Sequence, residues 1–328
     1  MKKVAINGFG RIGRLTFRHL INDSAIEVVA INDLTDNNTL AHLLKYDSAH
    51  GQFDGTVEAS DHEMIVNGKK IACFSERDPG KLPWKELGVN IVLECTGIFR
   101  TAEKVQPHLD AGAEKVLISA PGKDASFQSI VIGVNENELD RSKQLFSNAS
   151  CTTNCLAPLC KIVEQSWGFE QGTMTTVHAI TADQNLQDAP HSDLRRARAA
   201  SVNIVPTSTG AASAVGKVYP AVAGKMFAMA VRVPVITGSL VELNVIIEKE
   251  VTPEEVNQRF REASENEMKG ILQYTEDPIV SSDIVRNPHS AIFDAGLTDV
   301  KGKMLKIVAW YDNEAGYSAR LAQLTSML

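Results

Sequence analysis

The sequence predicts two domains of different fold class: an α/β domain built on a doubly wound parallel sheet, then an α+β domain with a mainly antiparallel sheet. Three observations lead to this prediction. The chain has 328 residues, which exceeds the size at which one hydrophobic core usually keeps growing. Its first part alternates short apolar runs with helical stretches. After residue 150, longer apolar strands follow one another.

The opening segment has the pattern of a βαβ unit. Val4-Ala5-Ile6 reads as a buried strand, a glycine-rich turn follows, and apolar residues then recur at helical spacing through Leu15 and Leu20. Ile26 to Ile31 is apolar and rich in β-branched residues, as expected of a second strand. Further strands are expected at 91–93, 116–118 and 129–132, with a helix at 101–111. Parallel strands joined by crossovers form a doubly wound sheet with helices on both faces.

The second part begins with a long helix, expected at 152–165. Long strands are expected at 173–180, 227–235, 240–248 and 304–311, with a helix at 253–264. Long strands close together in sequence predict a mainly antiparallel sheet with helices on one face. The domain boundary should fall at 147–150. Residues 181–206 show little periodicity, and loops of this length are usually functional or disordered.

Composition and charge argue against several classes of function. With 44% hydrophobic and 22% charged residues, the chain is that of an ordinary globular protein. The formal net charge of −7 argues against nucleic-acid or membrane-surface binding. No apolar run is long enough to span a bilayer, and Asn7-Gly8 interrupts the only signal-peptide-like start. The odd count of five cysteines suits reduced thiols, so we expect a cytoplasmic protein.

A dinucleotide-binding pattern follows the first strand. Gly8, Gly10 and Gly13 form a GxGxxG turn that opens a helix, where backbone N–H groups and the helix dipole favour a pyrophosphate. Asp33 ends the second strand, and its carboxylate can accept hydrogen bonds from a ribose 2′-OH. A 2′-phosphate would face a like charge, which favours NAD over NADP. The alternative is a glycine turn that binds another ligand, with Asp33 as a cap.

The candidate nucleophile is Cys151, which stands just before the apolar helix. Unsatisfied N–H groups at a helix N-terminus stabilise a thiolate, so we expect a lowered thiol pKa. An arbitrary cysteine is more often a small core residue, which is how we interpret Cys73, Cys95 and Cys160. Cys155 lies on the same helical face as Cys151 and is a candidate disulfide or metal partner, but the nearby sequence lacks the further ligands that a metal site needs. No metal is expected.

Two polar residues interrupt apolar strands. His178 lies in the strand expected at 173–180, where a lone histidine is more often a hydrogen-bonded core residue than a catalytic base. Sequence spacing does not place it beside Cys151. Arg232 lies in the next long strand, where a cation is costly unless paired. Either a salt bridge or a phosphate or carboxylate ligand would satisfy its guanidinium fork.

The whole chain resembles the phosphorylating glyceraldehyde-3-phosphate dehydrogenases. The motifs that carry the resemblance occur in order as NGFGRIGR (7–14), ASCTTNC (149–155), TVH (176–178), DLRRAR (193–198), NIVPTSTGAA (203–212) and WYDNE (310–314). The resemblance implies that Cys151 attacks the aldehyde of glyceraldehyde 3-phosphate, with His178 as base. Hydride then passes to NAD, and inorganic phosphate cleaves the resulting thioester to 1,3-bisphosphoglycerate.

The resemblance also implies the binding residues. The substrate phosphate region would contain Thr181, Arg196 and Arg232, although which phosphate Arg196 serves stays open. The second phosphate region would contain Ser150, Thr152, Thr209 and Gly210. NAD would be bound by Gly8, Gly10, Arg11, Ile12, Gly13, Asp33, Arg77, Thr96 and Ser119, with Asn313 holding the nicotinamide carboxamide.

The domain organisation follows from the same resemblance. Residues 1–149 would form the NAD-binding Rossmann domain, completed by the C-terminal helix at 313–328, and residues 150–312 the catalytic domain. The loop at 181–202 would cross a subunit interface, which implies a homotetramer. The chain departs from the family at Ser213, where lysine is usual, and at Ala315, where tryptophan or threonine is common.

Two other functions fit part of this pattern. An erythrose-4-phosphate dehydrogenase shares the cysteine and histidine logic, although Thr207-Ser208-Thr209-Gly210 favours the glyceraldehyde type. A non-catalytic binding protein of the same fold would be expected to have a damaged nucleophile motif, and Cys151 and His178 are both intact.

Overall fold

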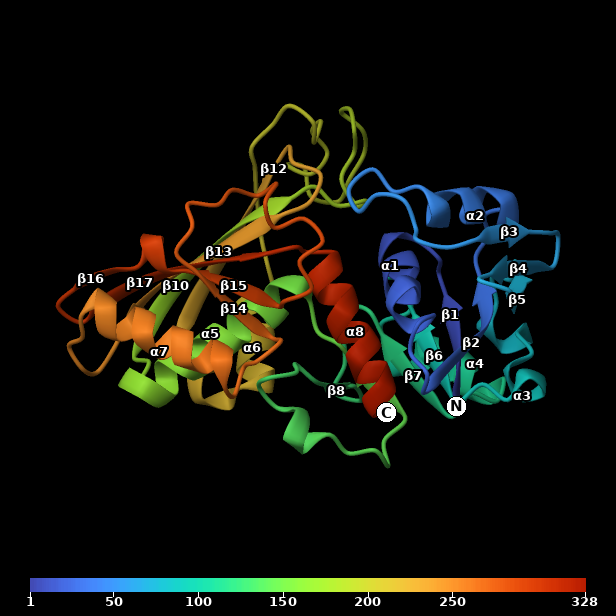
Figure 1. The fold of residues 1–328 in the computed structure, drawn as a ribbon, viewed down its shortest axis with the longest axis horizontal. Coiled ribbons are helices and arrows are strands. Elements are labelled where there is room, and N and C mark those ends of the chain that lie inside the picture. Colours follow the sequence, from blue (N-terminus) through green and yellow to red (C-terminus); the bar gives the residue numbers. More distant parts are fainter. The chain divides into compact units, whose positions relative to one another are not determined.

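The computed structural model describes residues 1–328 and divides the chain into two compact units (Figure 1). The first unit contains Met1–Ile130, Asn137–Ala149 and Ser318–Leu328. The second contains Val131–Glu136 and Ser150–Tyr317. None of the helices combines the length and the apolar character that crossing a membrane requires.

The first unit is built on a sheet of nine strands in the order β3-β4-β5-β2-β1-β6-β7-β9-β8. Their bounds are β1 (Lys2–Asn7), β2 (Ile26–Asn32), β3 (Val57–Ala59), β4 (Glu63–Val66), β5 (Lys69–Phe74), β6 (Ile91–Glu94), β7 (Lys115–Ile118), β8 (Gln128–Ser129) and β9 (Leu145–Ser147). From β5 to β8 all neighbours are parallel. The central strands are apolar because both of their faces are buried.

The helices of this unit are α1 (Arg11–Leu20), α2 (Asn37–Lys45), α3 (Trp84–Leu87), α4 (Ala102–Asp110) and the part of α8 (Ala315–Met327) from Ser318 on. α1 connects β1 to β2 on one side of the sheet centre, and α4 connects β6 to β7 on the other. Right-handed crossovers in opposite directions place helices on opposite faces. The predicted doubly wound sheet is confirmed.

Two details of this unit differ from the sequence analysis. The hairpins of β3, β4 and β5 extend the sheet with antiparallel pairs. Buried apolar residues do alternate in β4 and β5, but each of these strands has only two of them, and β3 has none. The strand expected at 129–132 ends at Ser129. Beyond it, Asn135 Oδ1 accepts from the backbone N–H of Val131, so that a turn takes up the donor a strand would have used.

The second unit contains a sheet in the order β11-β12-β10-β13-β17-β15-β14, with β16 paired to β17. The bounds are β10 (Gln171–Ala179), β11 (Val205–Thr207), β12 (Met226–Val233), β13 (Ser239–Ile246), β14 (Leu272–Thr275), β15 (Ala291–Asp294), β16 (Asp299–Lys301) and β17 (Met304–Tyr311). Only the pairs β10–β12 and β14–β15 are parallel, which confirms a mainly antiparallel sheet.

The helices α5 (Cys151–Trp167), α6 (Ala211–Val218) and α7 (Pro253–Glu265) lie along one face of this sheet, as Figure 1 shows. Short 3₁₀ helices occur at η1 (Pro79–Lys81), η2 (Glu136–Glu138), η3 (Pro220–Val222) and η4 (Ala295–Leu297). Thr176 and His178 of β10 belong to the buried set of this strand. On β12, Phe227 is 83% and Met229 45% exposed. Because strand side chains alternate between faces, these two lie on the face opposite to Arg232.

Candidate functional site

The thiol of Cys151 is placed by the start of α5. Cys151 is the first residue of this helix and is half-buried. Ser150 caps the helix, because its side chain accepts from the backbone N–H of Thr153 at 3.1 Å. The cap fixes the first turn and, with it, the position of the sulfur. All five cysteines are free thiols.

His178 comes to this thiol from the end of β10. Its Nε2 lies 3.5 Å from Cys151 Sγ, and its Nδ1 lies 2.7 Å from the carbonyl oxygen of Ala179. A carbonyl only accepts, so we assign the proton to Nδ1. The lone pair of Nε2 then points toward the thiol. This is the arrangement of a nucleophile and its general base.

Arg232 stands beside His178 because β10 and β12 are parallel neighbours whose register pairs the two residues. Its Nη1 uses its two N–H bonds to donate to Thr181 Oγ1 at 2.9 Å and to the Ala179 carbonyl at 3.2 Å. Nη1 also lies 3.0 Å from His178 Nδ1, but both nitrogens donate their protons to oxygen atoms, so this approach is not a hydrogen bond. Arg232 forms no ion pair, and its buried Nε has no partner. Of the two interpretations left open by the sequence, the salt bridge is therefore wrong, and an anion ligand remains.

Burial favours the neutral form of this pair. Burial first, and then the nearby Arg232 guanidinium, lower the pKa of His178 to about 3. Burial raises the pKa of the Cys151 thiol, while Arg232 and the first N–H groups of α5 act in the opposite direction. The expected net lowering of this pKa is wrong, because desolvation of the thiolate outweighs the helix terminus. A neutral thiol therefore faces a neutral imidazole.

Thr181 and Arg196 are joined through Asp183, which the sequence analysis had not identified. Thr181 Oγ1 donates to Asp183, and Arg196 Nη1 lies 2.6 Å from the other oxygen of this carboxylate. Arg196 Nε also donates to Thr207 Oγ1 at 3.0 Å. Arg196 thus already has a carboxylate partner, whereas Arg232 has none.

The other four predicted phosphate ligands lie at two helix starts. Ser150 and Thr152 belong to the first turn of α5, where Ser150 serves as cap and Thr152 Oγ1 is 3.0 Å from Tyr311 Oη. Gly210 occupies the N-cap position of α6, and Thr209 Oγ1 accepts from Ala211 N–H at 3.2 Å. No hydrogen bond joins Thr209 or Gly210 to Cys151. Of the two departures from the family, Ser213 is exposed on α6 and Ala315 is buried at the start of α8.

Tyr311 is a site residue to which the sequence analysis gave no role. Its hydroxyl lies 3.0 Å from Thr152 Oγ1 and 2.9 Å from Thr176 Oγ1, and its ring meets the His178 imidazole edge-on at 5.9 Å between centroids. Tyr311 therefore connects the first turn of α5 to the strand that carries His178. Its place in the WYDNE motif was visible, but only the sheet register shows what it touches.

In the first unit, a pocket of about 370 Å³ lies at the glycine-rich turn. Gly8, Gly10, Asp33, Arg77 and Thr96 all line it. Asp33 accepts from the backbone N–H groups of Phe9 at 2.8 Å and Thr35 at 3.0 Å, which fixes its carboxylate at the pocket. No side chain caps α1, so its first N–H groups are suited to a pyrophosphate. These donors and this acceptor fit a dinucleotide.

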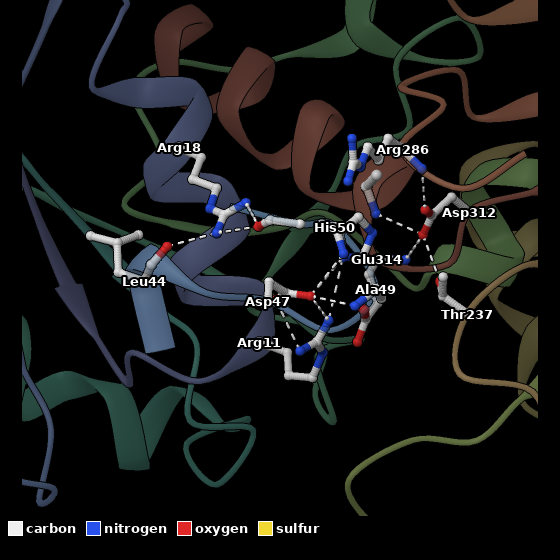
Figure 2. A network of polar contacts seen from close by, with 12 residues as sticks. Arg11, Arg18, Leu44, Asp47, Ala49, His50, Thr237, Arg286, Asp312 and Glu314 are labelled. Atoms are coloured by element: carbon white, nitrogen blue, oxygen red, sulfur yellow. Dashed lines mark hydrogen bonds and ion pairs between the residues drawn. The ribbon is translucent and has the colours of Figure 1, made fainter. Parts of the chain in front are cut away.

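The remaining predicted cofactor residues have structural partners. A Cβ on Gly13 would lie 2.3 Å from the Gly8 carbonyl, so α1 can approach the turn only with glycine there. Arg11 pairs with the buried Asp47, with Nη1 and Oδ2 3.0 Å apart (Figure 2). Ile12 lies half-buried in α1, and Ser119 follows β7 with its N–H bonded to the Glu94 carbonyl. Neither Ile12 nor Ser119 lines the pocket.

A buried carboxylate lies behind the pocket. Glu94 accepts from Asn7 Nδ2 at 2.5 Å, from Thr96 N–H at 2.8 Å and from the Thr96 hydroxyl. His108 Nε2 lies 3.3 Å from the same carboxylate, and Trp84 Nε1 donates to His108 Nδ1 at 3.0 Å. The Trp84 bond assigns the imidazole proton to Nε2, so His108 donates to Glu94.

Asn313, in the second unit, has its side-chain amide oxygen bound and its amide nitrogen free. Its Oδ1 accepts from Ser239 Oγ at 2.9 Å and from Gly238 N–H at 3.2 Å. Its Nδ2 makes no hydrogen bond within the protein and is therefore available as a donor. No group of three or more His, Cys, Asp or Glu side chains is arranged to hold a metal ion.

Comparisons with known proteins extend over nearly the whole chain. The family model described as glyceraldehyde 3-phosphate dehydrogenase, NAD binding domain, matches residues 2–102, and the model of the C-terminal domain matches residues 150–313. This chain is 53% identical to each of three curated proteins named glyceraldehyde-3-phosphate dehydrogenase, from Mycobacterium avium, Mycobacterium tuberculosis and Geobacillus stearothermophilus. Each alignment covers 99% of this chain and 98% of the relative.

Proposed function

The chain belongs to the family of glyceraldehyde-3-phosphate dehydrogenases, and from this premise we propose that it converts D-glyceraldehyde 3-phosphate, NAD and inorganic phosphate to 1,3-bisphosphoglycerate and NADH. The observation that carries the proposal is the 3.5 Å approach of Cys151 Sγ to His178 Nε2, next to an arginine without a carboxylate partner. An intact nucleophile and base argue against a non-catalytic protein of the same fold.

His178 acts first as a base. As Cys151 Sγ attacks the aldehyde carbon, Nε2 takes the thiol proton, so the thiolate does not have to exist as a stable species in a buried site. The Ala179 carbonyl holds Nδ1–H and stabilises the imidazolium that forms. The imidazolium then returns this proton to the former aldehyde oxygen, which gives a hemithioacetal on Cys151 and a neutral His178. Removal of its hydroxyl proton, again by Nε2, prepares the loss of hydride.

NAD supplies the hydride acceptor that converts the hemithioacetal to a thioester on Cys151. Gly8, Gly10, Arg11, Ile12, Gly13, Asp33, Arg77, Thr96, Ser119 and Asn313 are proposed to bind it. Asp33 selects NAD, because its carboxylate suits a ribose hydroxyl and repels a 2′-phosphate. Inorganic phosphate then attacks the thioester carbon, and the Cys151 sulfur leaves.

The substrate phosphate is proposed to bind Arg232 and Thr181. Arg232 has a guanidinium with a buried, unpartnered Nε, a charge-assisted donor suited to phosphate oxygens. Ser150, Thr152, Thr209 and Gly210 are proposed for the attacking phosphate. Arg196 would serve either phosphate only after exchanging its contact with Asp183.

We also propose a cytoplasmic homotetramer. Large apolar side chains, among them Phe227 and Met229, are exposed on the outer sheet face of the second unit, and an exposed apolar patch is suited to bury against a second copy.

We also propose a functional division into two domains. The NAD-binding domain would consist of residues 1–149, completed by 313–328, and the catalytic domain of residues 150–312. The two compact units support a division of this kind.

The direct test measures NADH formation by the purified protein with NAD, phosphate and glyceraldehyde 3-phosphate. We expect turnover that depends on phosphate and is faster than with erythrose 4-phosphate. Absence of NADH formation contradicts the proposal, and a higher kcat/KM for erythrose 4-phosphate would assign the alternative substrate. Equal or better efficiency with NADP would refute the role of Asp33.

A further inference from the structure

Ser239 occupies a position between two groups that the proposed reaction has to align. It is the first residue of β13, and its side chain is 1% exposed. Its hydroxyl accepts from the backbone N–H of Ala179 at 3.0 Å and donates to Asn313 Oδ1 at 2.9 Å. The direction of both bonds is forced, because a backbone N–H can only donate and an amide oxygen can only accept.

On one side, Ser239 holds the residue that orients the base. The N–H of Ala179 is bound by Ser239, and the carbonyl of Ala179 binds His178 Nδ1 at 2.7 Å. Ala179 is thus held at both its N–H and its carbonyl. A shift of Ala179 would move the contact that sets the His178 tautomer and, with it, the direction of Nε2.

On the other side, Ser239 sets the amide of Asn313. With Oδ1 bound to Ser239 and Gly238, a flipped amide would place its NH₂ group against the Gly238 N–H and would leave the Ser239 O–H without its acceptor. The backbone around Asn313 is held as well, because the Asp312 carboxylate accepts from Thr237 Oγ1 at 2.8 Å and from Glu314 N–H at 2.9 Å (Figure 2). Nδ2 is therefore presented as a donor in one fixed direction.

We propose that Ser239 is a positioning residue that fixes the Asn313 amide for the nicotinamide carboxamide and, through Ala179, anchors the His178 base in the same framework. This inference rests on the proposed function, since it takes the carboxamide as the partner of Asn313. A donor in a fixed direction recognises the carbonyl oxygen of a carboxamide. One hydroxyl group thereby connects the orientation of the cofactor with the orientation of the base.

The test compares binding of NAD with binding of ADP-ribose, which lacks the nicotinamide, by titration calorimetry. The wild type should bind NAD more tightly than ADP-ribose. Ser239→Ala should weaken NAD binding by roughly 5- to 100-fold, the range for a buried group left without its hydrogen bond, and leave ADP-ribose binding within about twofold. Ser239→Thr, which keeps the hydroxyl, should restore most of the difference.

Ser290→Ala is the matched control, because Ser290 is also buried, at 3% exposure, and its Oγ has no partner. This variant should bind both ligands as the wild type does. Should Ser239→Ala fail to fold, Ser239→Cys, with similar volume and a weak donor, replaces it. A variant that keeps the preference for NAD, or that weakens both ligands equally, overturns the inference. A wild type that binds NAD no better than ADP-ribose overturns it too, whereas a wild type that binds neither contradicts the proposed function itself.

Discussion

The two units each bury a histidine, at 0% exposure for His108 and 3% for His178, but surround it with opposite charge. His108 lies 3.3 Å from the Glu94 carboxylate, and Trp84 binds its other nitrogen. His178 has the Arg232 guanidinium at 3.0 Å and a carbonyl at 2.7 Å. Beside an anion, the imidazole serves as a donor that helps to satisfy a buried carboxylate.

Burial, reinforced by the neighbouring cation, keeps the His178 imidazole neutral, and its free lone pair is directed at a thiol. Burial alone therefore does not distinguish a structural histidine from a base. What distinguishes them is the charge of the neighbour and the nitrogen that this neighbour leaves free. The following predictions test this contrast in order of expected effect.

The largest effect is expected for His178→Asn, which removes the acceptor for the Cys151 proton. Turnover should fall by roughly 10²- to 10⁴-fold, the usual contribution of general-base assistance, with NAD affinity nearly unchanged. The comparison variant is His108→Asn, which should lower the unfolding temperature and leave turnover of the folded protein within about tenfold. Steady-state kinetics with glyceraldehyde 3-phosphate measure the turnover of both variants. Near-normal turnover of His178→Asn would make His178 a structural residue like His108.

Glu94→Ala should affect stability more than chemistry. Asn7, Thr96 and His108 lose their common acceptor, and each buried donor left without a partner costs about 1–3 kcal/mol. Urea unfolding measures the loss. Turnover per folded molecule at saturating NAD should change by less than about tenfold. A loss of turnover without a loss of stability would show that the carboxylate takes part in the reaction.

Arg232→Ala should discriminate between substrates. The variant loses a charge-assisted contact with the substrate phosphate, so kcat/KM for glyceraldehyde 3-phosphate should fall by roughly 10- to 100-fold. Use of unphosphorylated glyceraldehyde should decrease much less. Arg198→Ala is the control, because Arg198 pairs with Asp188 at an exposed site. Equal losses for both aldehydes would mean that Arg232 serves only to hold β10 and β12 together.

The smallest effect concerns pH. The folded pKa of His178, about 3, lies below the ordinary value of 6.5, so the unfolded chain binds a proton that the folded chain does not. Stability is therefore lost as pH falls from 6.5 toward 3. At pH 5.5 this loss amounts to about 1 kcal/mol relative to pH 7.5. Between these two pH values, the free energy of unfolding of His178→Asn, measured with urea, should fall by that much less than the free energy of the wild type. An identical pH dependence of the variant and the wild type would contradict a neutral His178 imidazole in the folded protein.

Sequence patterns were sufficient where structure is local. The apolar runs of β1, β2, β10 and β17 and the periodicity of α5 and α7 lie where they were expected. The hairpins of β3, β4 and β5 were missed because each strand buries at most two side chains, and so short an alternation gives a weak period-2 signal. The turn after β8 was missed because a side-chain amide, that of Asn135, decides it.

The site was less accessible to sequence reasoning, because its contacts are long-range. Cys151 and His178 are 27 positions apart, and no spacing rule brings a helix start to a strand end over that distance. Motif resemblance drew attention to both residues, but the pairing of His178 with Arg232 comes from sheet register. Tyr311 and Ser239 were overlooked for the same reason, since hydroxyl groups acquire a role only from what packs against them.

The parallel register of β10 and β12 determines where insertions and deletions can be tolerated in such a chain. Insertions and deletions in the segment between the two strands leave the pairing of His178 with Arg232 intact, because this pairing is set within the strands. That segment also holds β11, α6 and the proposed phosphate ligands, so only its loops can change length freely. Deleting one residue within Met226–Val231 would instead turn Arg232 to the opposite sheet face, where Phe227 and Met229 are exposed. Length variation among relatives should therefore accumulate in the connecting segment and be nearly absent from both strands.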